Sequence, residues 1–421
     1  MYITLSETRR ELRQVARCHG WSLDAVDVFE LVPPETTLDP ERMLTVFHPA
    51  EVELSETTKL IFDRVEAINP TRVVLDSLSE LRLLAQSLLR YRRQVLAIKH
   101  FFALRRCTVV LLDDLSSTNA DAQLHSISHG VILLEQLAIE YGAERRRLRV
   151  IKMRGIQFRG GFHNFTIKKS GLEIYPRLVA AEHHSIFVGE FTSRGVAEID
   201  QILGGGLERG TNALLIGPAG VGKSSLAPTY ALAAASCGEH AVFFAFDEGR
   251  GTFEARARTP GLPLQQQLDG GLIRFQQVDP AELSPGEFAA NVRRSVDVDG
   301  ARIVIIDSLN GYLNAMPDER FLIPQMHELL SYLGRKGVVT ILLLARHGLV
   351  GPMQSPLDIS YLSDAVLMLR YFEVDGTLRR ALSVMKKRSG EHENTIREYR
   401  LTKGGIQLGP PLIGFRGILS D

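Results

Sequence analysis

Gly217-Pro218-Ala219-Gly220-Val221-Gly222-Lys223-Ser224 is the stretch of sequence that decides the fold. It matches the pattern G-x-x-x-x-G-K-[ST]; the apolar run Asn212–Ile216 precedes it and the alanine-rich stretch Leu226–Ser236 follows it. This order predicts a strand, a glycine-rich turn and a helix, which is the context the phosphate-binding pattern requires. A chance glycine-rich turn is the alternative, and the flanking elements argue against it.

The pattern predicts how a nucleoside triphosphate would be held. Glycines let the backbone wrap closely around phosphate oxygens, so that N–H groups and the helix N-terminus point inward. Lys223 would place a positive charge at the β- and γ-phosphates, and the Ser224 hydroxyl would ligate Mg²⁺. The residues predicted to bind nucleotide are Gly217, Pro218, Ala219, Gly220, Val221, Gly222, Lys223, Ser224 and Ser225.

Composition is that of an ordinary soluble protein with room for two domains. The chain has 421 residues, 45% hydrophobic and 23% charged, and its 49 basic and 49 acidic side chains give a net charge of zero. This balance lacks the excess of basic residues that obligatory binding to nucleic acid or to a membrane surface would require. Three widely spaced cysteines argue against disulfides and structural zinc. With no signal peptide and no membrane-length apolar run, the sequence predicts a cytoplasmic location.

An internal repeat decides the domain organisation. Arg72-Val-Val-Leu-Asp76-Ser recurs as Arg302-Ile-Val-Ile-Ile-Asp307-Ser, with the aspartates 231 residues apart. Thr166–Ile174 recurs as Arg400–Leu408 after 234 residues. Such long offsets indicate a duplicated domain rather than a short solenoid repeat.

Each copy alternates short apolar strands with helices. Strands are predicted at Ala241–Phe246, Arg302–Ile306, Val338–Leu344 and Ala365–Leu369, with a helix over Leu322–Leu333. This order predicts an α/β fold with mostly parallel central sheets covered on both faces. Antiparallel strands around Tyr371–Lys386 and Glu398–Leu408 are expected to close each domain.

The two copies differ at their beginnings. Glu248 follows Lys223 by 25 residues, whereas the matching Glu7 lies close to Met1. We therefore expect a first domain, 1–178, without a phosphate loop, a linker, 179–190, and a complete second domain, 191–421. Truncation of the sequence and decay of the first domain into a scaffold both remain open. In neither case would the first domain hold ATP alone.

Acidic residues follow two of the predicted strands. Asp307 would emerge at the C-terminal edge of the sheet, where nucleotide sites lie, and would hold Mg²⁺ together with Ser224. Glu248 is the candidate general base for the water that attacks the γ-phosphate. Asp247 either supports Glu248 or is a solvated neighbour.

Basic residues lie late in the second copy. Lys386, Lys387 and Arg388 close a predicted strand, and Lys386 and Arg388 are candidates to reach the nucleotide of an adjacent subunit, as arginine fingers do. A plain solvated face is the alternative. Arg346 and His347, after another strand, either sense the γ-phosphate or form an ordinary hydrogen-bonded turn.

Taken together, these motifs resemble the RecA-type ATPase superfamily, and specifically the KaiC family of double-domain ATPases. The resemblance covers essentially the whole chain. It is carried by the duplicated order of motifs and by five segments, namely Gly195–Gly210, the phosphate loop, Phe246-Asp247-Glu248, Ile306-Asp307-Ser308-Leu309 and Ile396-Arg-Glu-Tyr399.

The resemblance implies a homohexameric ring that binds ATP and Mg²⁺ at subunit interfaces and hydrolyses ATP. Lys223 and Ser224 would then contact phosphates and metal, Glu248 and Asp247 would form the catalytic pair, Asp307 would be the second acidic residue, and Lys386 and Arg388 would act in trans. Signalling to unidentified partner proteins is also implied. Four residues of the first copy match positions of the family. Because this copy has no phosphate loop, these residues are expected to be vestigial, namely Glu7, Asp76, Lys152 and Arg154.

Some members of the family phosphorylate themselves on adjacent serine and threonine residues shortly before the last core strand. Here Ser360 matches the serine, but Tyr361 replaces the threonine, so Ser360 alone is the candidate phosphoacceptor.

Two other functions stay open. A RecA-like, ATP-dependent DNA-binding motor would need basic loops facing the ring centre, and the segments 311–320 and 348–360 contain almost none. A scaffold that uses ATP only as a structural ligand suits the first copy, whereas Glu248 argues against it for the second.

Overall fold

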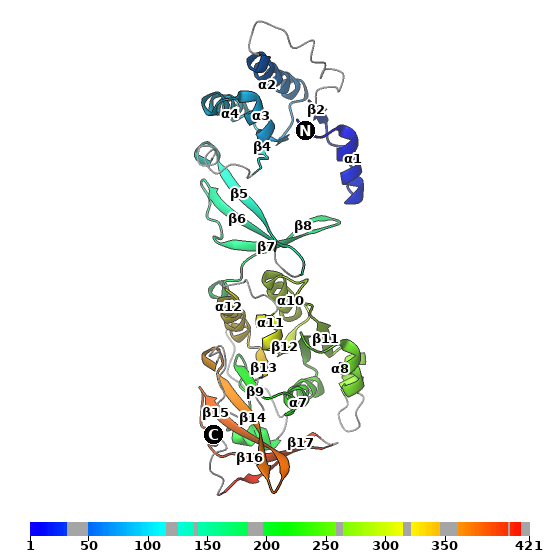
Figure 1. The fold of residues 1–421 in the computed structure, drawn as a ribbon, viewed down its shortest axis with the longest axis vertical. Helices are drawn as coiled ribbons and strands as arrows, with labels where there is room; N and C mark the ends of the chain where they lie inside the picture. Colours follow the sequence, from blue (N-terminus) through cyan, green and yellow to red (C-terminus); the bar gives the residue numbers. More distant parts are fainter. Residues whose placement is uncertain are drawn as a thin grey trace. The chain divides into compact units, whose positions relative to one another are not determined.

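The computed structural model describes residues 1–31, 49–114, 125–138, 142–183, 197–257, 264–314, 321–345, 360–402 and 405–413 (Figure 1). Contacts divide the chain into two compact units: residues 1–135 with 148–174 form unit 1, and residues 136–147 with 175–421 form unit 2. Both units combine helices with parallel sheets, which confirms the predicted α/β class. Arg346 and His347, which either sense the γ-phosphate or form an ordinary hydrogen-bonded turn, lie outside the described residues.

Unit 2 is built on a nine-stranded sheet in the order β11-β10-β12-β13-β9-β14-β15-β16-β17. Pairing is parallel from β11 through β14 and antiparallel from β14 through β17. The strands are β9 (Asn212–Gly217), β10 (His240–Ala245), β11 (Ile273–Gln277), β12 (Ala301–Asp307), β13 (Val339–Ala345), β14 (Ala365–Val374), β15 (Thr377–Lys387), β16 (Arg397–Thr402) and β17 (Gly405–Pro411).

The predicted strands are confirmed, with one difference at the point where the sheet changes from parallel to antiparallel pairing. The sequence predicts a parallel strand at Ala365–Leu369 and an antiparallel segment from Tyr371. In the structure a single strand, β14, spans both: its first residues pair with β9 and its whole length pairs with β15. One long strand therefore couples the parallel core to the antiparallel end.

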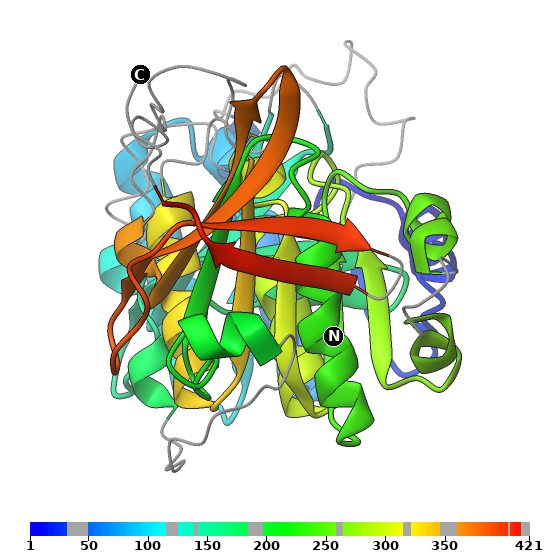
Figure 2. The same cartoon turned by 90° about the horizontal axis from the view of Figure 1, so that it is seen from below.

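The sheet of unit 2 is buried on both faces because its central strands carry mostly apolar side chains on each face. Along β9, Ala213 and Leu215 belong to one hydrophobic cluster, while Leu214 and Ile216 belong to the other. This alternation follows from the two-residue period of a strand. The elements that cover the faces are α6 (Ala197–Ile202), α7 (Lys223–Ser236), α8 (Arg250–Ala257) and α9 (Leu264–Asp269) on one side, and η3 (Ala180–Glu182), α10 (Pro285–Asp297), α11 (Leu309–Asn314) and α12 (Leu322–Arg335) on the other (Figure 2).

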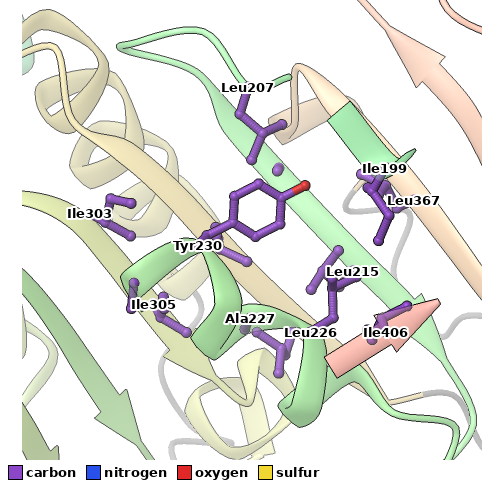
Figure 3. Close-up of a cluster of buried hydrophobic side chains, with 14 of the residues drawn as sticks. Ile199, Leu207, Leu215, Leu226, Ala227, Tyr230, Ile303, Ile305, Leu367 and Ile406 are labelled. Carbon is purple, nitrogen blue, oxygen red and sulfur yellow. The ribbon is translucent and has the colours of Figure 1, made fainter. Parts of the chain in front are cut away.

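The helix after the glycine-rich stretch packs closely on the sheet. Ala227, Tyr230 and Ala231 of α7 are almost completely buried. They belong to the same hydrophobic cluster as Ile303 and Ile305 of β12, and Figure 3 shows part of this cluster. Small side chains allow this close approach. The helix continues through Pro228, which lacks the N–H that would bond to the fourth residue before it.

The strands of unit 1 lie in two sheets of four, β2-β1-β3-β4 and β5-β6-β7-β8. The second sheet extends slightly into unit 2, through residues 136–137 of β5, 145–147 of β6 and Tyr175 of β8. The first sheet is parallel throughout. Its elements are β1 (Tyr2–Thr4), α1 (Arg9–Cys18), β2 (Val28–Glu30), α2 (Pro49–Ile68), β3 (Arg72–Asp76), α3 (Leu78–Ala85), α4 (Leu88–Ala103) and β4 (Thr108–Leu111). The second sheet comprises β5 (Gly130–Leu137), β6 (Arg145–Met153), β7 (Phe162–Lys168) and β8 (Gly171–Tyr175).

Comparison of the two strand orders locates the difference between the copies. In unit 2, β9 lies between β13 and β14 and joins the parallel and antiparallel parts. Within the described residues of unit 1, no strand takes that place, and the corresponding strands β4 and β5 belong to separate sheets. The described part of the first copy thus has no counterpart of the strand that carries the phosphate loop.

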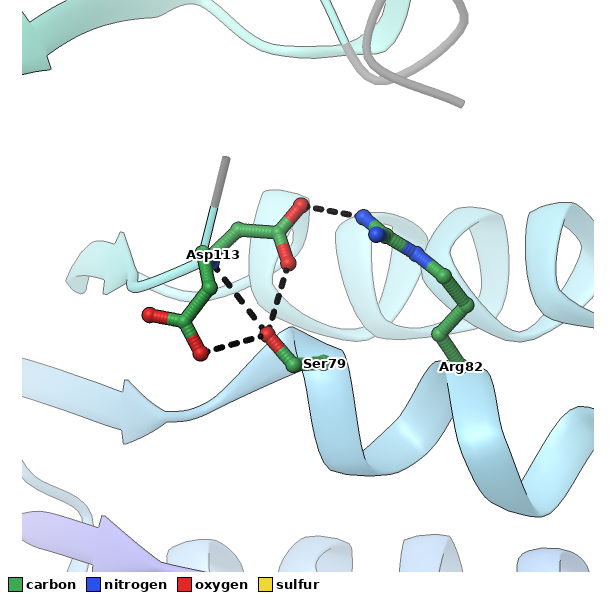
Figure 4. A network of polar contacts seen from close by, with 4 residues as sticks. Ser79, Arg82 and Asp113 are labelled. Carbon is green, nitrogen blue, oxygen red and sulfur yellow. Dashed lines mark hydrogen bonds and ion pairs between the residues drawn. The ribbon is translucent and has the colours of Figure 1, made fainter. Parts of the chain in front are cut away.

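A polar network holds the end of β4 to α3 in unit 1 (Figure 4). Ser79 Oγ lies 3.1 Å from both Asp113 Oδ1 and Asp114 Oδ2, so the two carboxylates share its one proton. Arg82 pairs with the other oxygen of Asp113 at 2.5 Å.

Among the described residues, no helix is both long and apolar enough to span a bilayer.

Candidate nucleotide-binding site

The glycine-rich stretch forms the turn between β9 and α7, and two of its residues have backbone angles that favour glycine. Gly220 has φ of +73°, and Gly222, at the N-cap of α7, has φ of +113°. A Cβ added to Gly217 would lie 2.3 Å from the carbonyl oxygen of Leu369 in β14. The glycines are therefore required by backbone geometry and by the neighbouring strand.

The antiparallel end of the sheet supports this loop. Tyr399 of β16 is buried, and its hydroxyl donates to the carbonyl of Val221. Burial raises the pKa of Tyr399, which keeps the phenol protonated as a donor. Leu401 lies against the loop, with its Cδ1 3.1 Å from the position a Cβ on Gly222 would take. Sequence reasoning gave Tyr399 no role in the site, because its contact with Val221 depends on how β16 packs.

Lys223 extends into the loop. Its side chain is largely buried, with 8% of the residue exposed, and Nζ donates to the carbonyls of Gly217 at 2.7 Å and Pro218 at 2.8 Å. Burial lowers the pKa of Lys223, and the nearby charge of Asp307 opposes this. The ammonium group is thus held within the turn predicted to bind phosphate.

Ser224 and Asp307 meet although 83 residues separate them in sequence. Ser224 Oγ donates to Asp307 Oδ2 at 2.8 Å. Burial raises the pKa of Asp307, while the Ser224 hydrogen bond and the charges of Arg256 and Lys223 lower it. Hydroxyl and carboxylate oxygens are ligands that suit Mg²⁺. The predicted pair of metal ligands therefore lies together, at the C-terminal end of β12.

Asp247 and Glu248 lie beside this pair because β10 and β12 are neighbours, with Ala245 opposite Asp307. Their carboxylates have different partners. Asp247 accepts a hydrogen bond from the Ser308 hydroxyl, at the start of α11. Glu248 Oε2 lies 2.8 Å from Nη2 of Arg256 in α8.

Burial raises the pKa of Glu248, and the charge and hydrogen bond of Arg256 lower it, while Asp307 raises it further. Sequence reasoning missed Arg256. The available signal was its place eight residues after Glu248, in the last turn of a helix that begins beside the candidate base.

The three consecutive basic residues have separate surroundings. Lys386 Nζ donates to the Ser363 carbonyl at 2.8 Å, and Arg388 pairs with Asp364 at 3.1 Å. Lys387 points elsewhere: its side chain is 4% exposed, and Nζ donates to the Leu203 carbonyl. Lys386 and Lys387 end β15 and differ in direction because successive side chains of a strand point to opposite faces.

The same arrangement recurs in unit 1. Lys152 Nζ donates to the His125 carbonyl at 2.5 Å, and Arg154 donates to the Ser126 carbonyl at 2.9 Å. In unit 2, Arg388 donates to the Tyr361 carbonyl at 2.9 Å. In each copy the basic pair thus contacts the backbone just before a strand, near η4 (Ser360–Leu362) in the second copy.

Comparisons with known proteins identify the family to which the chain belongs. The family model described as "ATPase: KaiC" matches residues 1–179 and 192–412. The chain is 24% identical to the circadian clock oscillator protein KaiC of Picosynechococcus sp. over 426 residues, which cover 100% of this chain and 81% of that protein. It is also 24% identical to the protein of the same name from Synechococcus elongatus, covering 100% of this chain and 81% of the relative.

A further relative is the circadian clock protein KaiC2 of Synechocystis sp., 25% identical over 434 residues, with 99% of this chain and 74% of the relative covered. The family match spans both copies and includes the phosphate loop of the second copy. It confirms the resemblance drawn from the motifs, and an ATPase family implies binding of ATP. This chain belongs to the KaiC family of ATPases.

Proposed function

We propose that unit 2 binds Mg-ATP at the phosphate loop and hydrolyses it. The observation that carries the proposal is the meeting of Ser224 and Asp307, at 2.8 Å, beside the buried Lys223. A phosphate loop alone indicates nucleotide binding. A loop whose serine contacts a carboxylate from another strand also offers a place for the metal that accompanies ATP.

The residues of the loop fit such a ligand. Loop N–H groups and the N-terminus of α7 would contact phosphate oxygens, and Lys223 would exchange its carbonyl partners for the β- and γ-phosphates. Ser224 and Asp307 would hold Mg²⁺, directly or through water. When bound, Mg²⁺ neutralises charge on the phosphates.

Glu248 is the proposed general base. It would accept a proton from water as the water oxygen forms a bond to the γ-phosphorus. The bond from that phosphorus to the oxygen bridging to the β-phosphate breaks, and ADP and inorganic phosphate leave. A raised pKa makes Glu248 a stronger proton acceptor than an ordinary glutamate. Asp247 is proposed to support this arrangement through its bond to Ser308 at the start of α11.

We propose that the active form is a homohexameric ring with nucleotide between subunits. Lys386 and Arg388 would then reach the γ-phosphate of a neighbouring subunit. The Arg388 side chain is 57% exposed, so its guanidinium is accessible to a neighbour while it pairs with Asp364. The relatives are named as clock proteins. By analogy, the ring is proposed to signal its nucleotide state to partner proteins.

Autophosphorylation is a second proposed activity, with Ser360 as acceptor. The observation that favours it is the contact of Lys386 and Arg388 with residues 361–364, next to Ser360. Incubation with Mg-ATP followed by mass spectrometry tests it. Phosphate on Ser360, absent from a Ser360→Ala variant, is the expected result, and an unmodified wild-type protein would contradict it.

Nucleotide binding and hydrolysis are tested by one substitution and a matched control. Lys223→Ala is expected to abolish both binding of Mg-ATP and release of phosphate. Lys336→Ala is expected to preserve both; it removes a half-buried lysine at the C-cap of α12, which pairs with Asp297 at the end of α10. ATP affinity that persists in the Lys223→Ala protein would contradict the assignment of the phosphate loop as the ATP-binding site. Binding without hydrolysis in the wild type would favour a scaffold instead.

A further inference from the structure

Arg256 lies beside the candidate base and belongs to none of the sequence motifs. It occupies the last turn of α8, with Nη2 2.8 Å from Glu248 Oε2. The two side chains are 27% and 18% exposed. An ion pair so shielded is screened less by salt than a surface pair.

A buried aromatic ring supports the arginine. The Arg256 guanidinium lies over the Phe253 ring, 5.3 Å from its centroid. Phe253 is completely buried and stacks on Phe275, with ring centroids 4.3 Å apart. A guanidinium over an aromatic face is attracted to it. The Arg256 side chain is therefore held in place by a ring of the hydrophobic core and does not extend freely into solvent.

The charge of Arg256 acts where acidic groups converge. Asp247, Glu248 and Asp307 all lie at the C-terminal ends of β10 and β12. Burial raises the pKa of Glu248, and the charge and hydrogen bond of Arg256 lower it. Of the three acidic residues, Glu248 is the one that forms the ion pair with Arg256.

We propose that Arg256 is a positioning residue for hydrolysis: its guanidinium fixes the Glu248 carboxylate in the orientation that accepts a proton from the attacking water. This inference rests on the proposed function, in which Glu248 is the base. Because Arg256 engages Oε2, the other oxygen, Oε1, is assigned to the water. Arg256 itself donates no proton and contacts no phosphate in this scheme.

Steady-state hydrolysis of Mg-ATP by the full chain tests the inference through Arg256→Gln and Arg256→Lys. Misplacing a catalytic group by about 1 Å can cost roughly a hundredfold in rate. We therefore expect Arg256→Gln to lower kcat by about tenfold to a hundredfold while KM changes by less than about twofold. Arg256→Lys should recover part of the loss, because it restores the charge without the planar fork.

Arg250→Gln is the matched control. Arg250 begins the same helix, its side chain is 73% exposed, and its guanidinium pairs with Glu254 at 2.7 Å. Its substitution is expected to leave kcat and KM unchanged. Affinity for a non-hydrolysable ATP analogue, measured on each variant, reports whether the site is folded. Loss of that affinity in both Arg256 variants would overturn the inference, because a residue that positions the base leaves binding intact.

A double-mutant comparison separates the inference from the proposed function on which it rests. If Arg256 acts through Glu248, then Arg256→Gln has no further effect on single-turnover hydrolysis by a Glu248→Gln protein. An equal loss in both backgrounds, or a wild-type kcat in Arg256→Gln, would overturn the positioning role alone. A wild-type kcat in Glu248→Gln would overturn the assignment of the base, and with it the role of Arg256.

Discussion

The hydroxyl of Tyr399 donates to the carbonyl of Val221 across 178 residues of sequence. This bond joins the antiparallel end of the sheet to the phosphate loop. Val221 is completely buried, so water cannot replace the phenol as a donor to its carbonyl. The loop conformation therefore depends on β16 as well as on its own glycines.

Tyr399→Phe is expected to lower both stability and nucleotide affinity. Leaving a buried carbonyl without a donor costs about 1–3 kcal/mol. Thermal unfolding and titration with ATP measure the two effects. Tyr230→Phe is the control: among the described residues the Tyr230 hydroxyl is buried with no hydrogen-bond partner, so its removal should be neutral or mildly stabilising. Equal behaviour of the two variants would contradict the role given to Tyr399.

The parts of the site that sequence predicted are those governed by local pattern and by general rules of sheets. The apolar run before Gly217 and the glycine pattern predict strand, turn and helix directly. The pairing of Ser224 with Asp307 follows because carboxyl ends of parallel strands share one edge of the sheet. Each step needs only the strand type and the position of a residue at its end.

The parts that sequence did not predict depend on side-chain packing between distant elements. No local pattern relates Tyr399 to Val221, since the contact depends on the position of β16 beside the loop. The pair of Glu248 and Arg256 depends on the angle at which α8 leaves the strand end. Lys387, by contrast, was grouped with its neighbours as one basic cluster, although the strand period separates it from them.

Asp307→Asn is expected to change the dependence of hydrolysis on Mg²⁺. The amide removes the negative charge opposite Ser224 but keeps the shape and an oxygen acceptor for its hydroxyl. We expect kcat to fall at least about tenfold and the Mg²⁺ concentration for half-maximal rate to rise, since charge on ligands sets affinity for hard cations. Titration of Mg²⁺ at fixed ATP measures both. An unchanged Mg²⁺ requirement would remove Asp307 from the metal site.

Gly217→Ala is expected to disrupt the loop through the strand beside it. Its Cβ would lie 2.3 Å from the Leu369 carbonyl oxygen, which belongs to backbone and cannot rotate away. Overpacking of this kind typically costs about 1–3 kcal/mol, and ATP binding should weaken as the turn shifts. Gly251→Ala, within α8 and with open space around its Cβ, should instead stabilise the helix by about 1 kcal/mol. Chemical denaturation compares the two proteins.

The stability of unit 2 is expected to fall in acid partly through Asp297, at the end of α10. Burial alone would raise the pKa of Asp297, but the hydrogen bond and charge of Lys336 hold it below its ordinary value. Lys336 Nζ lies 2.9 Å from the carboxylate.

A carboxyl group with a depressed pKa in the folded state contributes stability that is fully present above the unfolded pKa, about 3.9. This stability is lost as pH falls through the folded value. Asp297→Asn should therefore be less stable than the wild type at pH 7, and the difference should shrink below about pH 4. Denaturant unfolding at pH 7 and pH 3 measures it, and a difference that stays constant between the two would show that the charge of Asp297 does not stabilise the fold.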